Sequence, residues 1–148
     1  GISNGIVWTD DARTMFYIDT LERTVDAFDY DRQRGQLSNR RPVFNVPESM
    51  GYPDGMAIDS DDRLWVAFWG GSCVAQIDPA QGRVLATVTV PAAHVTACAF
   101  GGAALDELYI TTARSGLDDA TLAKQPAAGD LFVARPGATG VPAFTYSG

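Results

Sequence analysis

Three oxygen-bearing side chains recur at one position of a repeated segment and could together bind a cation. They are Asn4, Asp54 and Thr96, and each is followed by a glycine or an alanine. An amide oxygen, a carboxylate and a hydroxyl are hard ligands of the kind that Ca²⁺, Mg²⁺ or Mn²⁺ prefers. Asn-Gly and Asp-Gly pairs are also common turn signals. The residues alone therefore leave two interpretations open, a metal site and a set of turns that precede strands.

The three side chains are equivalent because the segments around them resemble one another. The copies are 3–8 with 15–19, 53–58 with 64–68, and 95–100 with 108–111. Aligned on residues 8, 58 and 100, they lie 50 and 42 residues apart. A period of about 40 to 50 residues with several strands per unit is typical of a β-propeller, whose blades surround a central channel. Innermost strands would then bring the three side chains to one ring near the axis.

The remaining patterns predict an all-β fold of three blades, at approximately 1–47, 48–91 and 92–148. Strand-like runs bounded by turn residues are 5–9, 14–19, 24–30, 42–46, 55–59, 63–68, 73–78, 83–90, a run beginning at 96, 107–112 and 130–134. In the insertion 113–129, Asp118 and Asp119 could cap a short helical turn through Leu122. This insertion is either a surface excursion or a functional lid.

Three blades raise the question of closure. The chain has 148 residues, whereas closed propellers have at least four blades. Two blade faces would stay uncovered. We therefore expect either a missing N-terminal half or a second copy of the chain to close the ring.

Composition excludes some partners. The net charge is −7, which argues against nucleic acid and against an anionic membrane surface. No run approaches the roughly 18 apolar residues of a membrane span, and the start shows no signal-peptide pattern. Cys73 and Cys98 lack metal-ligand spacing and are interpreted as small buried residues. Reduced thiols fit a cytoplasmic protein.

Other residues are weaker candidates. His94 is either a substrate contact near the channel mouth or a residue of the connection into the third blade. Tyr52 and Trp69 are expected in loops, where they could line a pocket or pack between blades. The run 59–62 superficially resembles a calcium loop, but it lacks EF-hand spacing and is interpreted as a solvated hairpin turn.

Longer motifs along the whole chain resemble one family. They are Ile2-Ser3-Asn4-Gly5, Phe16-Tyr17-Ile18-Asp19, 25–31, Ser38-Asn39-Arg40-Arg41, Pro53-Asp54-Gly55-Met56, Leu64-Trp65-Val66-Ala67, 98–102 and Tyr146-Ser147-Gly148. In this order they resemble the C-terminal half of the regucalcin (senescence marker protein) and gluconolactonase family.

The resemblance implies a six-bladed propeller of four-stranded blades, of which this chain supplies three. It implies one divalent metal ion (Ca, Mn, Mg or Zn) in the channel and hydrolysis of sugar lactones such as gluconolactone. Asn4 and Asp54 match the family's metal ligands, and Asp54 also matches its proposed acid/base. The third protein ligand, a glutamate, and the arginine and asparagine that hold the sugar belong to the other half, so the isolated half is expected to be inactive.

Two other functions fit the same residues. One is a non-enzymatic calcium-binding regulatory protein. The other is a related six-bladed esterase or phosphotriesterase, which would use Asn4 and Asp54 in the same way.

Overall fold

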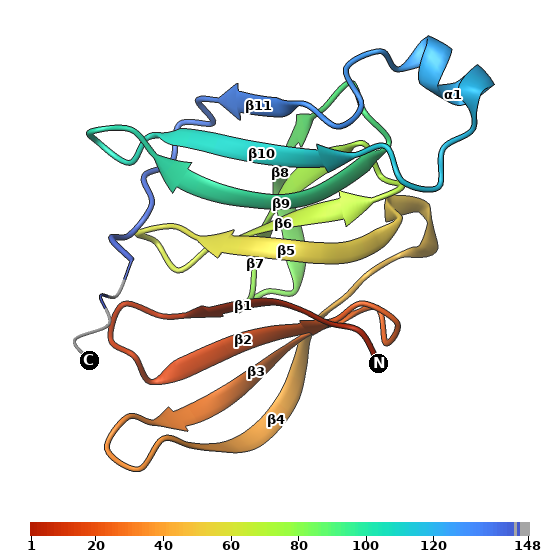
Figure 1. Ribbon diagram of the computed structural model, residues 1–148. Coiled ribbons are helices and arrows are strands. Elements are labelled where there is room, and N and C mark those ends of the chain that lie inside the picture. Colours follow the sequence, from red (N-terminus) through yellow and green to blue (C-terminus); the bar gives the residue numbers. More distant parts are fainter. Residues whose placement is uncertain (144, 146–148) are drawn as a thin grey trace.

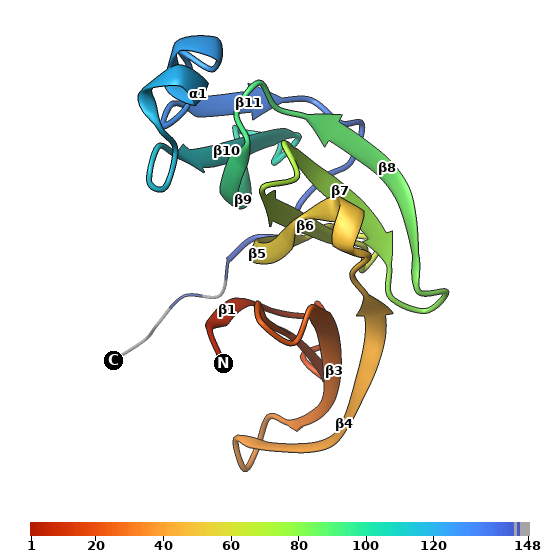
Figure 2. The same ribbon diagram turned by 90° about the vertical axis from the view of Figure 1, so that its right-hand side faces the viewer.

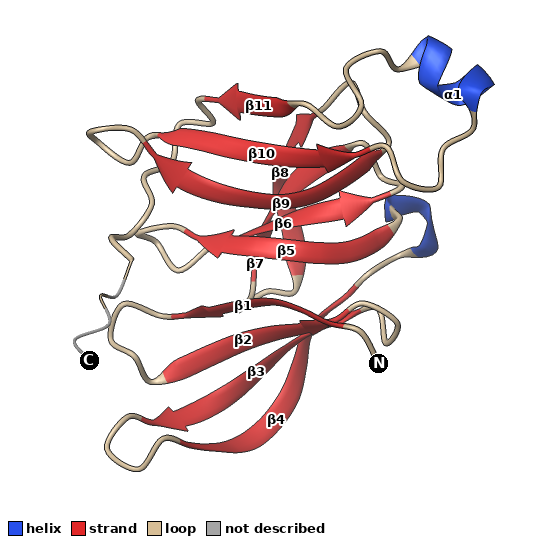
Figure 3. Ribbon diagram, viewed as in Figure 1, coloured by secondary structure: helices blue, strands red, loops and turns tan. Residues whose placement is uncertain are grey.

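The structure is a computed structural model that describes residues 1–143 and 145. Its strands are β1 (Ser3–Trp8), β2 (Thr14–Asp19), β3 (Thr24–Asp31), β4 (Gln36–Asn45), β5 (Tyr52–Ile58), β6 (Leu64–Trp69), β7 (Cys73–Asp78), β8 (Arg83–Thr89), β9 (His94–Gly101), β10 (Glu107–Ala113) and β11 (Leu131–Ala134). A 3₁₀ turn (Glu48–Met50) precedes β5, and α1 (Asp119–Lys124) lies between β10 and β11 (Figures 1 and 3). In the described part of the chain, no helix is both long and apolar enough to cross a membrane.

The strands form three antiparallel units in chain order. The first is β1-β2-β3-β4, the second β5-β6-β7-β8 and the third β9-β10-β11. Figure 2 shows the units fanned one above another, with β1, β5 and β9 on one side and β4 and β8 on the other. The all-β expectation is confirmed.

The third unit differs from the expected four-stranded blade. Within the described residues it has three strands, because the chain turns away after β11. Pro136 ends the strand, and Gly137 has a left-handed φ of 79°. Gly140 then pairs with Asp59, beside the second unit.

Strands β1, β5 and β9 approach one another closely, and this explains the small residues beside the candidate ligands. A Cβ on Gly5 would lie 2.9 Å from the Asp54 carbonyl oxygen, and one on Gly55 would lie 2.7 Å from the Cβ of Ala97. Larger residues would force the strands apart. The repeated glycines are therefore packing requirements between innermost strands.

Apolar side chains fill the spaces on both sides of the second unit. One cluster joins it to the first unit through residues such as Ile18, Val25 and Val66. Another joins it to the third through residues such as Val74, Val95 and Leu108. On the far face of the third unit, Leu131 and Val133 are 64% and 59% exposed, so this face is uncovered in the isolated chain.

Two sequence expectations about elements are settled by the structure. The helical turn is confirmed, since the Asp118 carboxylate accepts a hydrogen bond from the backbone N–H of Thr121 at the start of α1. The expectation that 31–41 is a loop is wrong, because β4 begins at Gln36. Asn39, with a φ of 53°, lies at a shift in the register between β3 and β4, and β4 continues beyond it. The next residue, Arg40, forms an ion pair with the buried Asp26 on β3.

Candidate metal site and substrate cavity

The three candidate ligands all lie at β-bulges of the innermost strands. The register of β1 skips Asn4 and Gly5 between its pairs at Ser3 and Ile6, and that of β5 skips Asp54 and Gly55 in the same way. In β9 the skipped residue is Thr96. These positions are inside strands, so the turn interpretation is wrong. A bulge re-aims a side chain that would otherwise follow the pleat, and bulges are frequent next to active sites.

Asn4 and Asp54 line one cavity of about 280 Å³. Its other lining residues are Ile2, Thr20, Leu21, Tyr52 and Trp69. The cavity lies where β1 and β5 begin and β2 and β6 end. These strand ends are on the right in Figure 1. Thr96 is not among the lining residues, and its hydroxyl is hydrogen-bonded to that of Thr111 at 2.7 Å. The structure thus brings together two of the three candidates.

The Asn4 side chain is held by its neighbour across the hairpin. Its Nδ2 donates to Thr20 Oγ1 at 3.1 Å, and the backbone N–H of Thr20 donates to the carbonyl of Ile2. A hydroxyl can accept from an amide N–H or donate to an amide oxygen. Thr20 can therefore support Asn4 with either its nitrogen or its oxygen turned toward the cavity.

Asp54 is a partly buried carboxylate that forms no ion pair with any described residue. Burial raises its pKa above the ordinary value, and the Asn4 amide and the backbone N–H of Gly55 offset only part of this effect. Among the ion pairs of the described residues, none involves Asp54. A bound cation would stabilise the charged form that burial disfavours.

The two oxygen donors fit part of a divalent-cation site. A carboxylate and an amide oxygen are ligand types that Ca²⁺ and Mg²⁺ take, but Ca²⁺ needs about six to eight oxygens. Within the described residues, no group of three or more His, Cys, Asp or Glu side chains could hold a metal ion. A cation in this cavity would find two side-chain oxygens on Asn4 and Asp54 and would need further oxygens to complete its coordination.

Aromatic side chains form one wall of the cavity. Tyr52 and Trp69 are directly paired at the ends of β5 and β6, and Trp69 is paired in turn with His94 on β9. The expectation that these residues lie in loops or connections is wrong, because each begins or ends a strand. Tyr52 and Trp69 line the cavity, and His94 stacks on Trp69 with ring centroids 3.9 Å apart.

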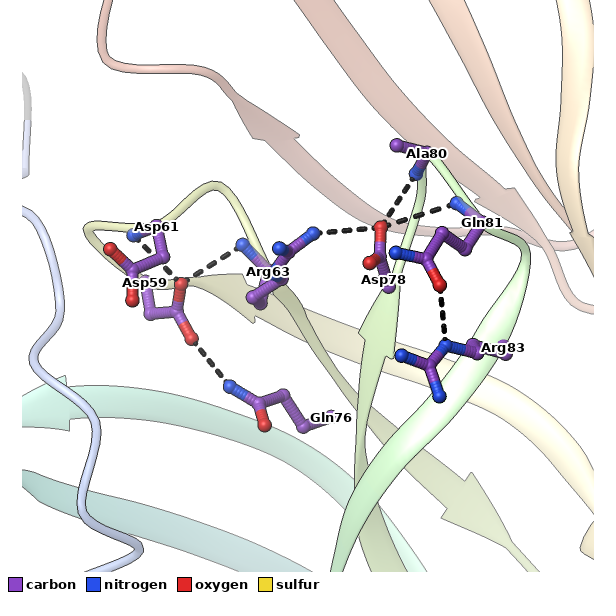
Figure 4. Close-up of polar contacts among 8 residues, drawn as sticks. All are labelled: Asp59, Asp61, Arg63, Gln76, Asp78, Ala80, Gln81 and Arg83. Atoms are coloured by element: carbon purple, nitrogen blue, oxygen red, sulfur yellow. Dashed lines mark hydrogen bonds and ion pairs between the residues drawn. The ribbon is translucent and has the colours of Figure 1, made fainter.

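The run 59–62 forms the expected hairpin turn, but one of its side chains is not solvated. Asp59 is only 2% exposed. Its Oδ1 accepts from the backbone N–H groups of Asp61 and Arg63, and its Oδ2 accepts from Trp65 Nε1 and Gln76 Nε2 (Figure 4 shows all but Trp65). A carboxylate saturated by four donors is a structural cap. An aspartate directly after an apolar strand often accepts a hydrogen bond from the backbone N–H two residues later, which here belongs to Asp61. This turn signal in the sequence could have revealed the role of Asp59.

Both cysteines are buried free thiols, as expected. Burial raises the pKa of the Cys98 thiol to about 12, and that of Cys73 also rises. Neither is a reactive thiolate.

Comparisons with known proteins support the resemblance. The sequence model of the SMP-30/Gluconolactonase/LRE-like region matches residues 1–114. The chain is 49% identical to regucalcin from Danio rerio over 148 residues, which are 99% of this chain and 50% of that protein. The fold superposes on a luciferin-regenerating enzyme with a TM-score of 0.86 and 41% identity, over 95% of this chain and 47% of the other.

A calcium-binding regucalcin from Agrobacterium tumefaciens str. C58 gives a TM-score of 0.84 at 28% identity, over 89% of this chain and 45% of that one. The chain thus spans about half the length of the curated relatives it matches.

Proposed function

The chain belongs to the SMP-30/gluconolactonase/LRE-like family, and from that premise we propose that it forms half of a six-bladed, divalent-metal-dependent lactonase that hydrolyses sugar lactones. The observation that supports this function most directly is Asp54. Its carboxylate shares a cavity with Asn4, its pKa is raised by burial, and it has no cationic partner among the described residues.

Asp54 acts as the general base in this proposal. Lactone hydrolysis forms a bond between a water oxygen and the carbonyl carbon and breaks the bond from that carbon to the ring oxygen. Asp54 accepts the proton of the attacking water and returns it to the departing ring oxygen, which leaves a hydroxy acid. Burial raises the pKa of Asp54 in the metal-free chain and a bound cation would lower it again, so the assignment as the base rests on the place of the carboxylate in the cavity. When bound, the divalent cation supplies Lewis acidity toward the carbonyl group.

Asn4 contributes a neutral oxygen in the same cavity. A second carboxylate would neutralise more of a cation's charge and reduce its pull on the substrate carbonyl. Thr20, as the partner of the Asn4 amide, orients this ligand, and such supporting hydrogen bonds tune metal sites.

The remaining ligands and substrate contacts belong to the part of the propeller outside this chain. The uncovered face with Leu131 and Val133 is where an adjoining blade would pack. We propose that this blade comes from an N-terminal half of the protein, with a second copy of the chain as the alternative.

A calcium-binding protein without enzymatic activity is the second candidate, because one similar structure is a calcium-binding regucalcin. A related esterase or phosphotriesterase is the third. All three need Asp54 and Asn4 near a cation, so only substrates separate them.

The test is hydrolysis of glucono-δ-lactone by the six-bladed protein, with and without Ca²⁺, Mn²⁺, Mg²⁺ or Zn²⁺. Metal-dependent turnover that Asp54→Asn abolishes supports the lactonase. Cation binding without turnover of lactones, esters or phosphotriesters favours the regulatory protein. Asp61→Asn is the matched control, because Asp61 is an exposed carboxylate seven residues farther along the chain.

A further inference from the structure

Tyr52, Trp69 and His94 occupy paired positions at the ends of three neighbouring strands. Tyr52 on β5 pairs with Trp69 on β6, and Trp69 pairs with His94 on β9. These positions lie at the edge where β5 and β9 begin, next to the cavity that holds Asn4 and Asp54. Of these three rings, Tyr52 and Trp69 line the cavity.

Each of the two lining rings packs against a neighbouring side chain. The Arg23 guanidinium lies 4.5 Å from the centroid of the Tyr52 ring, and its Nη2 donates to the carbonyl oxygens of Pro47 and Gly51 at 3.0 and 2.7 Å. His94 lies against Trp69 with an angle of 14° between the ring planes, which is a parallel stack. Rings supported in this way lose little conformational freedom when a ligand packs on them.

The orientation of His94 is fixed by the insertion between β10 and β11. Its Nδ1 lies 2.9 Å from the carbonyl oxygen of Ser115. A carbonyl oxygen only accepts, so Nδ1 carries the hydrogen and donates it. The same insertion is attached a second time, since Gln125 Oε1 accepts from the backbone N–H of Ala93 at 2.7 Å. The insertion is thus connected to the cavity wall through His94, which it binds at Ser115 and which stacks on Trp69.

We propose that Trp69 is a specificity-determining residue that stacks on the C–H face of a cyclic sugar substrate, and that His94 is a positioning residue that holds Trp69 in place. The inference rests on the proposed function and describes how the substrate is oriented in the cavity. The cavity has polar groups on Asn4, Thr20 and Asp54 and an aromatic wall beside them. A sugar lactone matches this division, because its carbonyl and hydroxyl groups lie at the ring edge and its ring face is largely apolar. Ligand sites commonly combine an aromatic lining with a few orienting polar groups.

Trp69→Ala in the six-bladed protein tests the wall. Loss of a stacking contact is worth about tenfold in binding, so KM for glucono-δ-lactone should rise about tenfold while kcat changes less than threefold. Trp69→Phe should restore most of the affinity. For methyl acetate, an open-chain ester without a ring, kcat/KM should change less than twofold. Equal losses on both substrates, or none on the lactone, would overturn the proposal.

Two substitutions at His94 separate stacking from hydrogen bonding. His94→Phe keeps a ring against Trp69, and His94→Asn keeps a donor for the Ser115 carbonyl without the ring. We expect KM for glucono-δ-lactone to stay within about twofold of wild type in the Phe variant and to rise about three- to fivefold in the Asn variant. The reverse order, or no change in either, would overturn the role of His94.

Binding of D-glucono-δ-lactam, a cyclic analogue that resists hydrolysis, separates this inference from the proposed function when it is measured by calorimetry. If the protein hydrolyses no lactone but binds the lactam about tenfold more weakly after Trp69→Ala, the sugar wall stands and the lactonase fails. If lactones are hydrolysed and the substitution leaves KM and lactam affinity unchanged, the wall fails alone. Absence of lactam binding in a protein that hydrolyses no lactone would overturn both.

Discussion

A buried carboxylate and a partly buried one lie at opposite ends of β5, and they differ in how well hydrogen bonds compensate for lost solvation. Asp59, directly after the strand, is 2% exposed and accepts four hydrogen bonds. Asp54, near its beginning, is less buried, yet its pKa is raised because the donors around it do not compensate for lost solvation. Hydrogen bonds thus compensate for the burial of Asp59, which is the more buried group, but only in part for that of Asp54.

Other buried carboxylates of the chain resemble Asp59. Asp78 pairs with Arg63 at 2.7 Å and accepts from the backbone N–H groups of Ala80 and Gln81 (Figure 4). Asp26 accepts from Arg40. Burial by itself therefore does not mark a functional acid in this fold. An incompletely compensated carboxylate beside a cavity is the informative feature, because folding gains nothing from it.

The largest expected effect is the loss of turnover in Asp54→Asn. Removal of a general base typically costs about 10²–10⁴-fold in rate, and impaired cation binding adds to this loss. The fold should persist, because Asp54 makes no ion pair among the described residues. Steady-state kinetics of the six-bladed protein are the measurement, and more than a tenth of the wild-type rate would exclude Asp54 as the base.

Asp59→Asn should show the opposite pattern. An asparagine has one acceptor oxygen and would place an NH₂ group against donors, so we expect a loss of about 3 kcal/mol in the free energy of unfolding. Metal affinity should be unchanged, because this side chain lies at the other end of β5. Urea denaturation measures the loss, and Asp61→Asn at the exposed position of the same turn should stay within about 0.5 kcal/mol of wild type.

Much of this contrast could not be predicted from sequence. The spacing of the repeats was sufficient for the all-β units and for the equivalence of Asn4, Asp54 and Thr96. It could not show that Thr96 bonds to Thr111 or that Gln76 completes the cap of Asp59, because these partners lie 15 and 17 residues away on other strands. The bulges were missed for a related reason, since an Asn-Gly pair has the same composition in a turn and in a bulge.

Asn4→Ala should weaken cation binding moderately. The substitution removes one neutral oxygen and leaves no buried charge unpaired, so we expect roughly tenfold lower affinity for Ca²⁺ or Mn²⁺, with stability nearly unchanged. Calorimetric titration of the six-bladed protein is the measurement. Thr20→Val is a graded comparison that removes only the partner of the Asn4 amide, and its effect should be smaller. Unchanged affinity in Asn4→Ala would remove Asn4 from the site.

The smallest effect concerns how stability depends on pH. The folded pKa of Asp54 lies above its usual 3.8 because burial disfavours the charged form. Between the unfolded and folded pKa values the native state holds a proton that the unfolded state has lost, so stability falls as pH rises through this window. Relative to wild type, Asp54→Asn should therefore gain stability as pH rises above 3.8, and added Ca²⁺ should reduce that gain by stabilising the wild-type carboxylate.

Asp29→Asn is the control of opposite sign. Hydrogen bonds from Asn39 and Arg41 lower the pKa of Asp29 in the folded protein. The wild type is therefore more stable than this variant above the unfolded pKa, and it loses that extra stability as pH falls. Urea denaturation across this pH range decides the matter: the same sign of change in both variants would mean that Asp54 is as well compensated as the structural carboxylates, and the contrast along β5 would fail.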